Sequence, residues 1–206
     1  MNTVLLILSV QALMGAFDNL WHHELQARLP QRASARRELT LHAAREAIYG
    51  VLFVGLGWLE WHGAFALALA ALLATELGIT LLDFLEEDRT RRLPPFERVL
   101  HTLLTIGYGL FIGVFAPIVA AWMRQPTALV ATPHGAWSWV FTAYGIAVSA
   151  WSLRNARAVV RLGRLPAPVA APQRAPAAAS CWPAASTSPP RSSRSRAACC
   201  SRRACW

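Results

Sequence analysis

The chain of 206 residues has no lysine, and no residue after Glu97 is acidic. Its four cysteines all follow residue 180, so neither a disulfide framework nor a cysteine-based metal site can belong to the first 160 residues. There is no G-x-G-x-x-G motif and no βαβ pattern, which excludes dinucleotide binding by the chain itself. The N-terminal apolar run has no basic region before it and no A-x-A site, so we interpret it as a retained helix.

Apolar residues make up 55 % of the chain, and nine residues are tryptophan. Long, nearly uncharged apolar stretches of this kind are typical of multi-pass α-helical membrane proteins. The formal net charge of +9 is uneven, because six arginines follow Arg164 and residues 1–164 carry only about +3. The basic and aromatic residues form no groove-like pattern, so we expect no nucleic-acid binding.

We predict an all-α integral membrane bundle of five transmembrane helices within a domain of residues 1–160. The expected helices cover about 3–20, 35–59, 63–88, 96–123 and 136–156, and about 20 residues suffice to cross a bilayer. Arginine is concentrated after the first, third and fifth helices, whereas the other two connections contain only Arg124. The positive-inside rule therefore predicts an outside N-terminus and a cytoplasmic C-terminus. Five tryptophans then form a belt at the outer interface: Trp58, Trp61, Trp122, Trp137 and Trp139.

Residues 161–206 differ abruptly in composition and consist mainly of Ala, Pro, Ser and Arg without periodicity. Such a segment cannot bury a core, so we expect a disordered basic tail. Its composition is also that of a GC-rich coding region read out of frame. A frameshift product is therefore the alternative to a genuine tail.

Side chains that commonly bind metals gather at the predicted cytoplasmic ends of the first four helices. Within each helix they recur at spacings of four or seven residues, which places them on one stripe. Carboxylates inside a membrane segment are costly, and Glu76 lies ~10 Å deeper than Asp83 at a helical rise of 1.5 Å per residue. We select seven candidate metal ligands: Asp18, His22, His42, Glu46, Glu76, Asp83 and His101.

Four helices that present carboxylate and imidazole groups at one level follow the logic of di-metal carboxylate bundles. Mixed oxygen and nitrogen ligation suits iron, manganese or zinc. A di-iron site would indicate an oxidoreductase, and a single zinc ion would suggest hydrolysis. The usual Glu-x-x-His motif and the histidine boxes of membrane desaturases are both absent, however. The pattern therefore favours a polar cluster without identifying its metal.

An ion-pair network is the competing interpretation, because five arginines lie at the same level: Arg45, Arg89, Arg91, Arg92 and Arg98. In this interpretation the acids near the interface are paired or solvated, and His23 faces water. Glu38 stabilises the N-terminus of its helix through the helix dipole. A third interpretation is a proton- or ion-coupled carrier that uses Glu76 as a relay. The lack of an inverted repeat counts against it.

The segments AFDNLWHHEL, SARRELTLHAAREAIYG and ITLLDFLEEDRTRRLPPFERVLHTLL together resemble an uncharacterised bacterial multi-pass membrane domain, sometimes found before short-chain dehydrogenase/epimerase-type domains. The resemblance covers residues 1–160. It implies a bacterial inner-membrane location and a dehydrogenase-like neighbour, and it supplies no catalytic residues.

We therefore expect an inner-membrane anchoring or interaction module for a cytoplasmic partner. The alternative is a metal-dependent, di-iron-like membrane oxidoreductase that uses the histidine and carboxylate residues. Whether the chain is an enzyme is open at this point.

Overall fold

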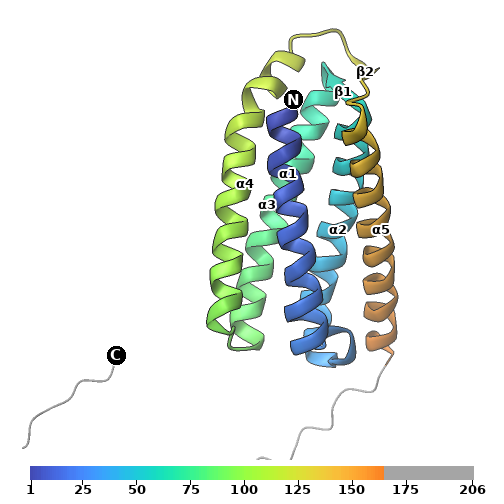
Figure 1. Cartoon of the computed structure of the whole chain (residues 1–206). Helices are drawn as coiled ribbons and strands as arrows, with labels where there is room; N and C mark the ends of the chain where they lie inside the picture. Colours follow the sequence, from blue (N-terminus) through green and yellow to red (C-terminus); the bar gives the residue numbers. More distant parts are fainter. Residues whose placement is uncertain (165–206) are drawn as a thin grey trace, which may run out of the picture. The chain divides into compact units, whose positions relative to one another are not determined.

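The computed structural model describes residues 1–164, so nearly all of the predicted tail at 161–206 lies outside the described residues. Five long helices account for most of the described chain (Figure 1). They are α1 (Asn2–Asp18), α2 (Arg36–Trp58), α3 (Ala64–Thr90), α4 (Pro95–Trp122) and α5 (Ala136–Gly163). These bounds confirm the predicted helical bundle, except that α5 is longer than expected. The first four helices, α1 with its continuation to Gln31, are long and apolar enough to cross a membrane.

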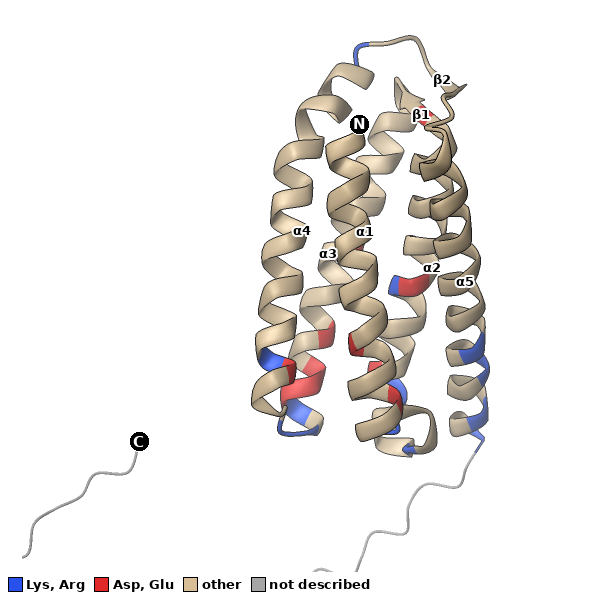
Figure 2. Cartoon of the chain, viewed as in Figure 1, with Lys and Arg blue, Asp and Glu red and all other residues tan. Residues whose placement is uncertain are grey.

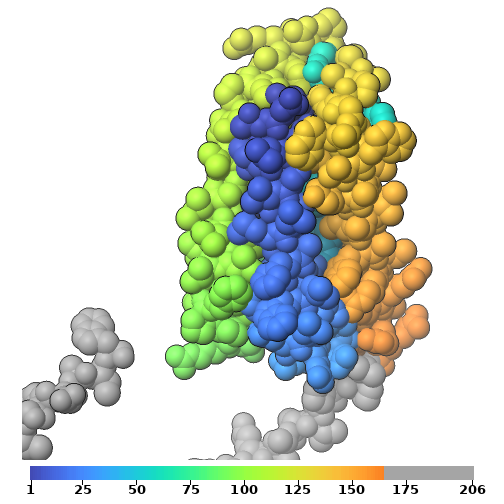
Figure 3. Space-filling model, viewed as in Figure 1, coloured from blue at the N-terminus to red at the C-terminus, as the bar shows by residue number. Residues whose placement is uncertain are grey.

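Helices α1 to α4 form the bundle, in which α1 packs against α4 and α2 against α3. Its core contains fully buried Leu5, Leu8, Leu52, Phe111 and Phe115. Large apolar side chains also cover the outward faces of the helices, which is the arrangement expected of a bundle surrounded by lipid. Figure 3 shows one such face, where α1 lies between α4 and α5.

Helix α5 packs along α2 (Figure 1) because small residues let the two backbones approach closely. A Cβ added to Gly57 would lie 2.9 Å from the Cβ of Phe141, which leaves no room for a larger residue. Two hydrogen bonds also join the helices: Ser138 donates to the carbonyl of Gly57 (2.6 Å), and Ser152 donates to that of Ala43 (2.7 Å). Close packing and hydrogen bonds therefore hold α5 in place.

A short antiparallel ribbon closes one end of the bundle. Strand β1 (Leu59–His62) pairs with β2 (Ala128–Ala131), with Leu59 opposite Ala131 and His62 opposite Ala128. Both strands lie mainly in connections between the predicted helices, where the sequence predicts no strand. Four-residue strands are too short to produce a recognisable period-2 pattern, so this ribbon depends on the two connections meeting in space.

Charged residues gather at the opposite end of the bundle (Figure 2). The acidic residues there lie on α1 to α4, and the arginines lie among them and on the last turns of α5. This end contains the side chains that the sequence selects as candidate ligands.

Candidate metal centre

Helix α1 continues beyond Asp18 as a π-helical segment, Asn19–Gln26. A π-helix has a wider turn than an α-helix, with i→i+5 hydrogen bonds such as that from Ala27 N–H to the carbonyl of His22 (2.7 Å). Both adjacent histidines of this segment are buried, His22 with 1 % and His23 with 2 % exposure. The expectation that His23 faces water is therefore wrong. The expectation fails because a π-helical turn does not keep the α-helical spacing on which it was based.

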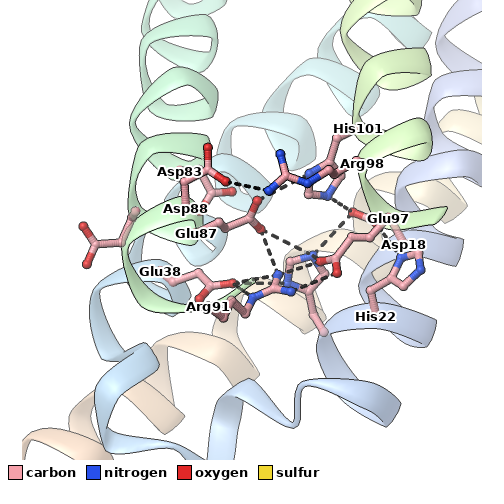
Figure 4. Close-up of polar contacts among 12 residues, drawn as sticks. Asp18, His22, Glu38, Asp83, Glu87, Asp88, Arg91, Glu97, Arg98 and His101 are labelled. Carbon is pink, nitrogen blue, oxygen red and sulfur yellow. Dashed lines mark hydrogen bonds and ion pairs between the residues drawn. The ribbon is translucent and has the colours of Figure 1, made fainter. Parts of the chain in front are cut away.

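Buried polar residues from four elements meet below the apolar core (Figure 4). They come from the end of α1 with its π-helical segment, from α2, from α3 and from α4. We call this set the polar cluster; its members are Asp18, His23, Glu38, His42, Asp83, Glu87, Glu97 and His101.

Two overlapping groups within the polar cluster bring together enough ligand-type side chains to hold a metal ion. One contains His23, Glu87, Glu97 and His101, and the other contains His23, Glu38, His42 and Glu87. In each group the potential ligand atoms all lie within 4.8 Å of one another. Ligands about 2.0–2.2 Å from one ion lie roughly 3.0–3.6 Å apart, so small side-chain movements suffice to close either group around a metal.

Glu87 joins the two groups. Its Oε1 atom lies 4.0 Å from Nε2 of His42, and its Oε2 atom lies 3.4 Å from Nδ1 of His101. The two oxygens of one carboxylate thus face histidines of different groups. A carboxylate in this position would be able to bridge two ions about 3.5–4 Å apart.

Asp18 orients the histidines rather than joining either group. Its Oδ1 accepts a hydrogen bond from His22 Nδ1 (2.7 Å), and its Oδ2 faces His101 Nε2 at 3.1 Å. With the His101 proton on Nε2, the Nδ1 lone pair is free on the side of Glu87. Carboxylates commonly fix metal-binding histidines in this way. His22, a predicted ligand, belongs to neither group and supports Asp18.

Two arginines supply positive charge to the polar cluster. Arg91, just beyond α3, donates to Glu97 (2.6 Å), Glu38 (3.2 Å) and Glu87 (3.2 Å), as Figure 4 shows. Burial opposes its charge, but the hydrogen bond to Glu97 and the charges of Glu38 and Glu87 raise its pKa. Arg91 therefore occupies a position on the carboxylates that a metal ion would need.

Arg45 is the second of these arginines. It lies 3.2 Å from Asp83 and donates to Nδ1 of His42 (3.1 Å), which leaves the proton of a neutral His42 on Nε2. Ligation of a metal through Nε2 requires the other tautomer, with Arg45 withdrawn from His42. Arg45 and a metal ion would thus compete for His42. In the same way, Arg91 and a metal ion would compete for the carboxylates.

Ion pairing leaves the polar cluster incompletely compensated. Five carboxylates face two guanidinium groups, an excess of three negative charges when the histidines are neutral. Several buried atoms also make no hydrogen bond, namely both ring nitrogens of His23, Nε2 of His42, Oδ1 of Asp83 and Oε2 of Glu87. Three of them lie at ion-pair distance from another group of the cluster: His23 Nε2 is 3.4 Å from Asp18, His42 Nε2 is 3.2 Å from Asp83, and Glu87 Oε2 is 3.4 Å from His101. Each unsatisfied buried group costs about 1–3 kcal/mol. A purely structural ion-pair network would be expected to satisfy these atoms.

Five of the seven predicted ligands lie outside both groups, namely Asp18, His22, Glu46, Glu76 and Asp83. Glu46 accepts hydrogen bonds from Asn19 (2.6 Å) and Asn155 (3.0 Å), and so links α1 and α5 to α2. Glu76 lies farther along α3 and accepts from Thr80 (3.0 Å), while its second oxygen has no partner. Glu46 therefore serves a contact between helices, whereas the hydrogen bond of Glu76 lies within α3.

Sequence reasoning did not select four residues of the two groups: His23, Glu38, Glu87 and Glu97. Three of them had a detectable signal, because Glu38, Glu87 and Glu97 each lie four residues from a selected histidine or aspartate. Glu87 and Glu97 had been interpreted as paired or solvated acids near the interface, and Glu38 as an acid that stabilises the N-terminus of its helix. The signal for His23 was hidden by the change from α to π geometry.

The fold and the site together define a bundle of apolar, membrane-length helices with a buried cluster of histidine and carboxylate side chains at one end. No family model matches the chain, and comparisons with curated proteins and with solved structures gave no match. Function therefore has to be inferred from the geometry.

Proposed function

We propose that this chain is a multi-pass membrane metalloprotein that holds one or two metal ions in the polar cluster and acts as a di-iron-like oxidoreductase. The observation that supports this function is the buried His23 ring, whose two nitrogens make no hydrogen bond and lie 3.4–3.9 Å from carboxylates of four elements. A structural histidine in such a place would be expected to donate at least one hydrogen bond.

The donor set favours iron or manganese. It combines three imidazoles with several carboxylates, and Glu87 is placed to bridge two ions. Carboxylate-rich ligation suits harder cations such as manganese, and mixed imidazole and carboxylate ligation suits iron. Zinc, with a hydrolytic function, is the competing outcome of the metal analysis described below.

We further propose five membrane crossings with the N-terminus outside and the C-terminus in the cytoplasm, in a bacterial inner membrane. Helix α5 is less apolar than the others, but it packs along α2 and would cross with it. The polar cluster then lies on the cytoplasmic side. A reporter enzyme that works only in the cytoplasm should be active when fused after residue 164 and inactive when fused within the β2 connection.

Metal analysis of the protein purified in detergent tests the metal function. We expect at least one equivalent of iron, manganese or zinc per chain, with most of it lost in His23→Ala and His42→Ala. His62→Ala is the matched control, because His62 lies on β1 at the other end and pairs with Glu60 (3.0 Å). Folded wild-type protein that takes up no metal from a replete medium would refute the proposal.

Anchoring of a partner is a second candidate, favoured by exposed arginines at the same end of the bundle. They include Arg28, Arg32, Arg36, Arg37, Arg89 and Arg92. Such a surface suits an acidic partner, and the dehydrogenase-like neighbour remains a prediction. Reversing the charges of Arg28 and Arg32 should abolish co-purification of the partner while the metal content stays constant.

A further inference from the structure

A groove with a volume of about 420 Å³ opens between α3 and α4 beside the polar cluster. Two of its lining residues, Glu87 and His101, belong to the proposed metal groups. These two helices pack less closely against each other than α1 packs against α4. The volume falls in the range of about 300–1,000 Å³ that is usual for small-molecule sites. The groove therefore connects the candidate metal centre with the surface of the bundle.

Apart from Glu87, His101 and the charged pair Asp88 and Arg98, the lining of the groove is apolar or weakly polar. Phe84 stacks on the ring of His101 with centroids 5.2 Å apart and planes 14° apart, and Ile106 is 63 % exposed at the opening. The hydroxyls of Thr102 and Thr105 are engaged with backbone carbonyls of their own helix (both 2.8 Å). These walls suit an apolar molecular surface.

Exposed apolar side chains flank the groove, as expected where a helix bundle contacts lipid. Exposed leucines flank it on both helices, namely Leu81 and Leu85 on α3 and Leu103 on α4. At the rim, Arg98 donates to Asp88 (3.2 Å; Figure 4), so the guanidinium group nearest the groove is already paired. The carboxylate of Glu87 in the groove also disfavours an anionic ligand.

We propose that this groove binds the substrate of the metal centre, and that this substrate is a membrane-soluble molecule with an apolar body and a terminal hydroxyl or carbonyl oxygen. The proposal rests on the proposed metal function. The apolar body lies along Phe84 and Ile106, and the oxygen points towards the ligands Glu87 and His101. The substrate enters laterally from the bilayer between α3 and α4.

Two hydroxamates serve as probes, because a hydroxamate combines a hydroxyl and a carbonyl oxygen and gives a visible absorption band with iron(III). Decyl hydroxamate carries an apolar chain, and acetohydroxamate does not. Both are titrated into iron-loaded full-length protein in one detergent. The variants are Thr102→Trp, which fills the groove from an exposed position, and Leu110→Trp, a control on an exposed face of α4 outside the groove lining.

We expect Thr102→Trp to weaken binding of decyl hydroxamate at least tenfold, with unchanged iron content and little change for acetohydroxamate. Leu110→Trp should match the wild type for both probes. Because detergent takes up the decyl probe equally in all samples, the comparison between variants does not depend on partitioning. Iron-loaded protein in which Thr102→Trp and Leu110→Trp bind the decyl probe alike overturns the groove proposal alone. Folded protein that takes up no metal at all overturns the metal function and the groove proposal together.

Discussion

Replacing Arg91 with glutamine separates a metal centre from a structural ion-pair network. The Arg91 side chain is 13 % exposed and contacts Glu38, Glu87 and Glu97 at 2.6–3.2 Å. A metal ion in either group would draw on the same carboxylates. The arginine and the metal therefore compete, and removal of the arginine has opposite consequences for the metal-free and the metal-loaded protein.

In metal-free protein, Arg91→Gln leaves three buried carboxylates without their main cation. Removing one partner of a buried ion pair costs about 3–5 kcal/mol. For a chain of this size about 1 kcal/mol corresponds to 2–4 °C, so the melting temperature should fall by roughly 6–12 °C at the lower bound. In metal-loaded protein the ion compensates the same carboxylates, and the loss should shrink to about 1 kcal/mol or less. Metal affinity should rise at the same time.

The assay is thermal unfolding in mild detergent, with the metal removed by a chelator or restored in excess. Arg98→Gln is the matched control, since Arg98 is 56 % exposed and its pair with Asp88 is a surface ion pair worth about 0–1 kcal/mol. Equal destabilisation of Arg91→Gln with and without metal would refute the competition and favour the structural network.

Three further predictions concern single side chains. If the wild type holds two ions per chain, Glu87→Gln should lower the metal content to one or fewer, because an amide bridges poorly. Elemental analysis measures this, and an unchanged content of two would exclude the bridging role. Glu46→Gln should leave the metal content within error of the wild type, since Glu46 contacts only Asn19 and Asn155 among the described hydrogen bonds; loss of metal in this variant would place Glu46 in the site after all. Gly57→Leu should lower the free energy of unfolding by about 1–3 kcal/mol, because the new side chain clashes with Phe141. Unfolding in detergent measures this, and stability equal to the wild type would show that α5 can shift away from α2 without cost.

Much of the fold follows from local features of the sequence. Apolar runs such as residues 63–88 are long enough to be recognised as membrane-length helices without any tertiary information. Spacing by four within a helix likewise placed His42 and Asp83 correctly on inward stripes, and both lie in the polar cluster. The sequence alone therefore determined the number and extent of the helices and the end of the bundle at which the polar side chains gather.

Tertiary structure decided which of those side chains meet. Helical periodicity assigns a residue to a face, but the rotation and tilt of neighbouring helices determine whether that face reaches the centre of the bundle. The packing of the helices brought Glu87 and Glu97 into the polar cluster, while Glu76 stayed outside it. The π-helical turn after α1 buried His23, since a change in helical pitch leaves no trace in residue spacing. The pairing of β1 with β2 also arises only when distant connections come together. A local pattern limits where each side chain can point, and packing of the whole chain selects its partners.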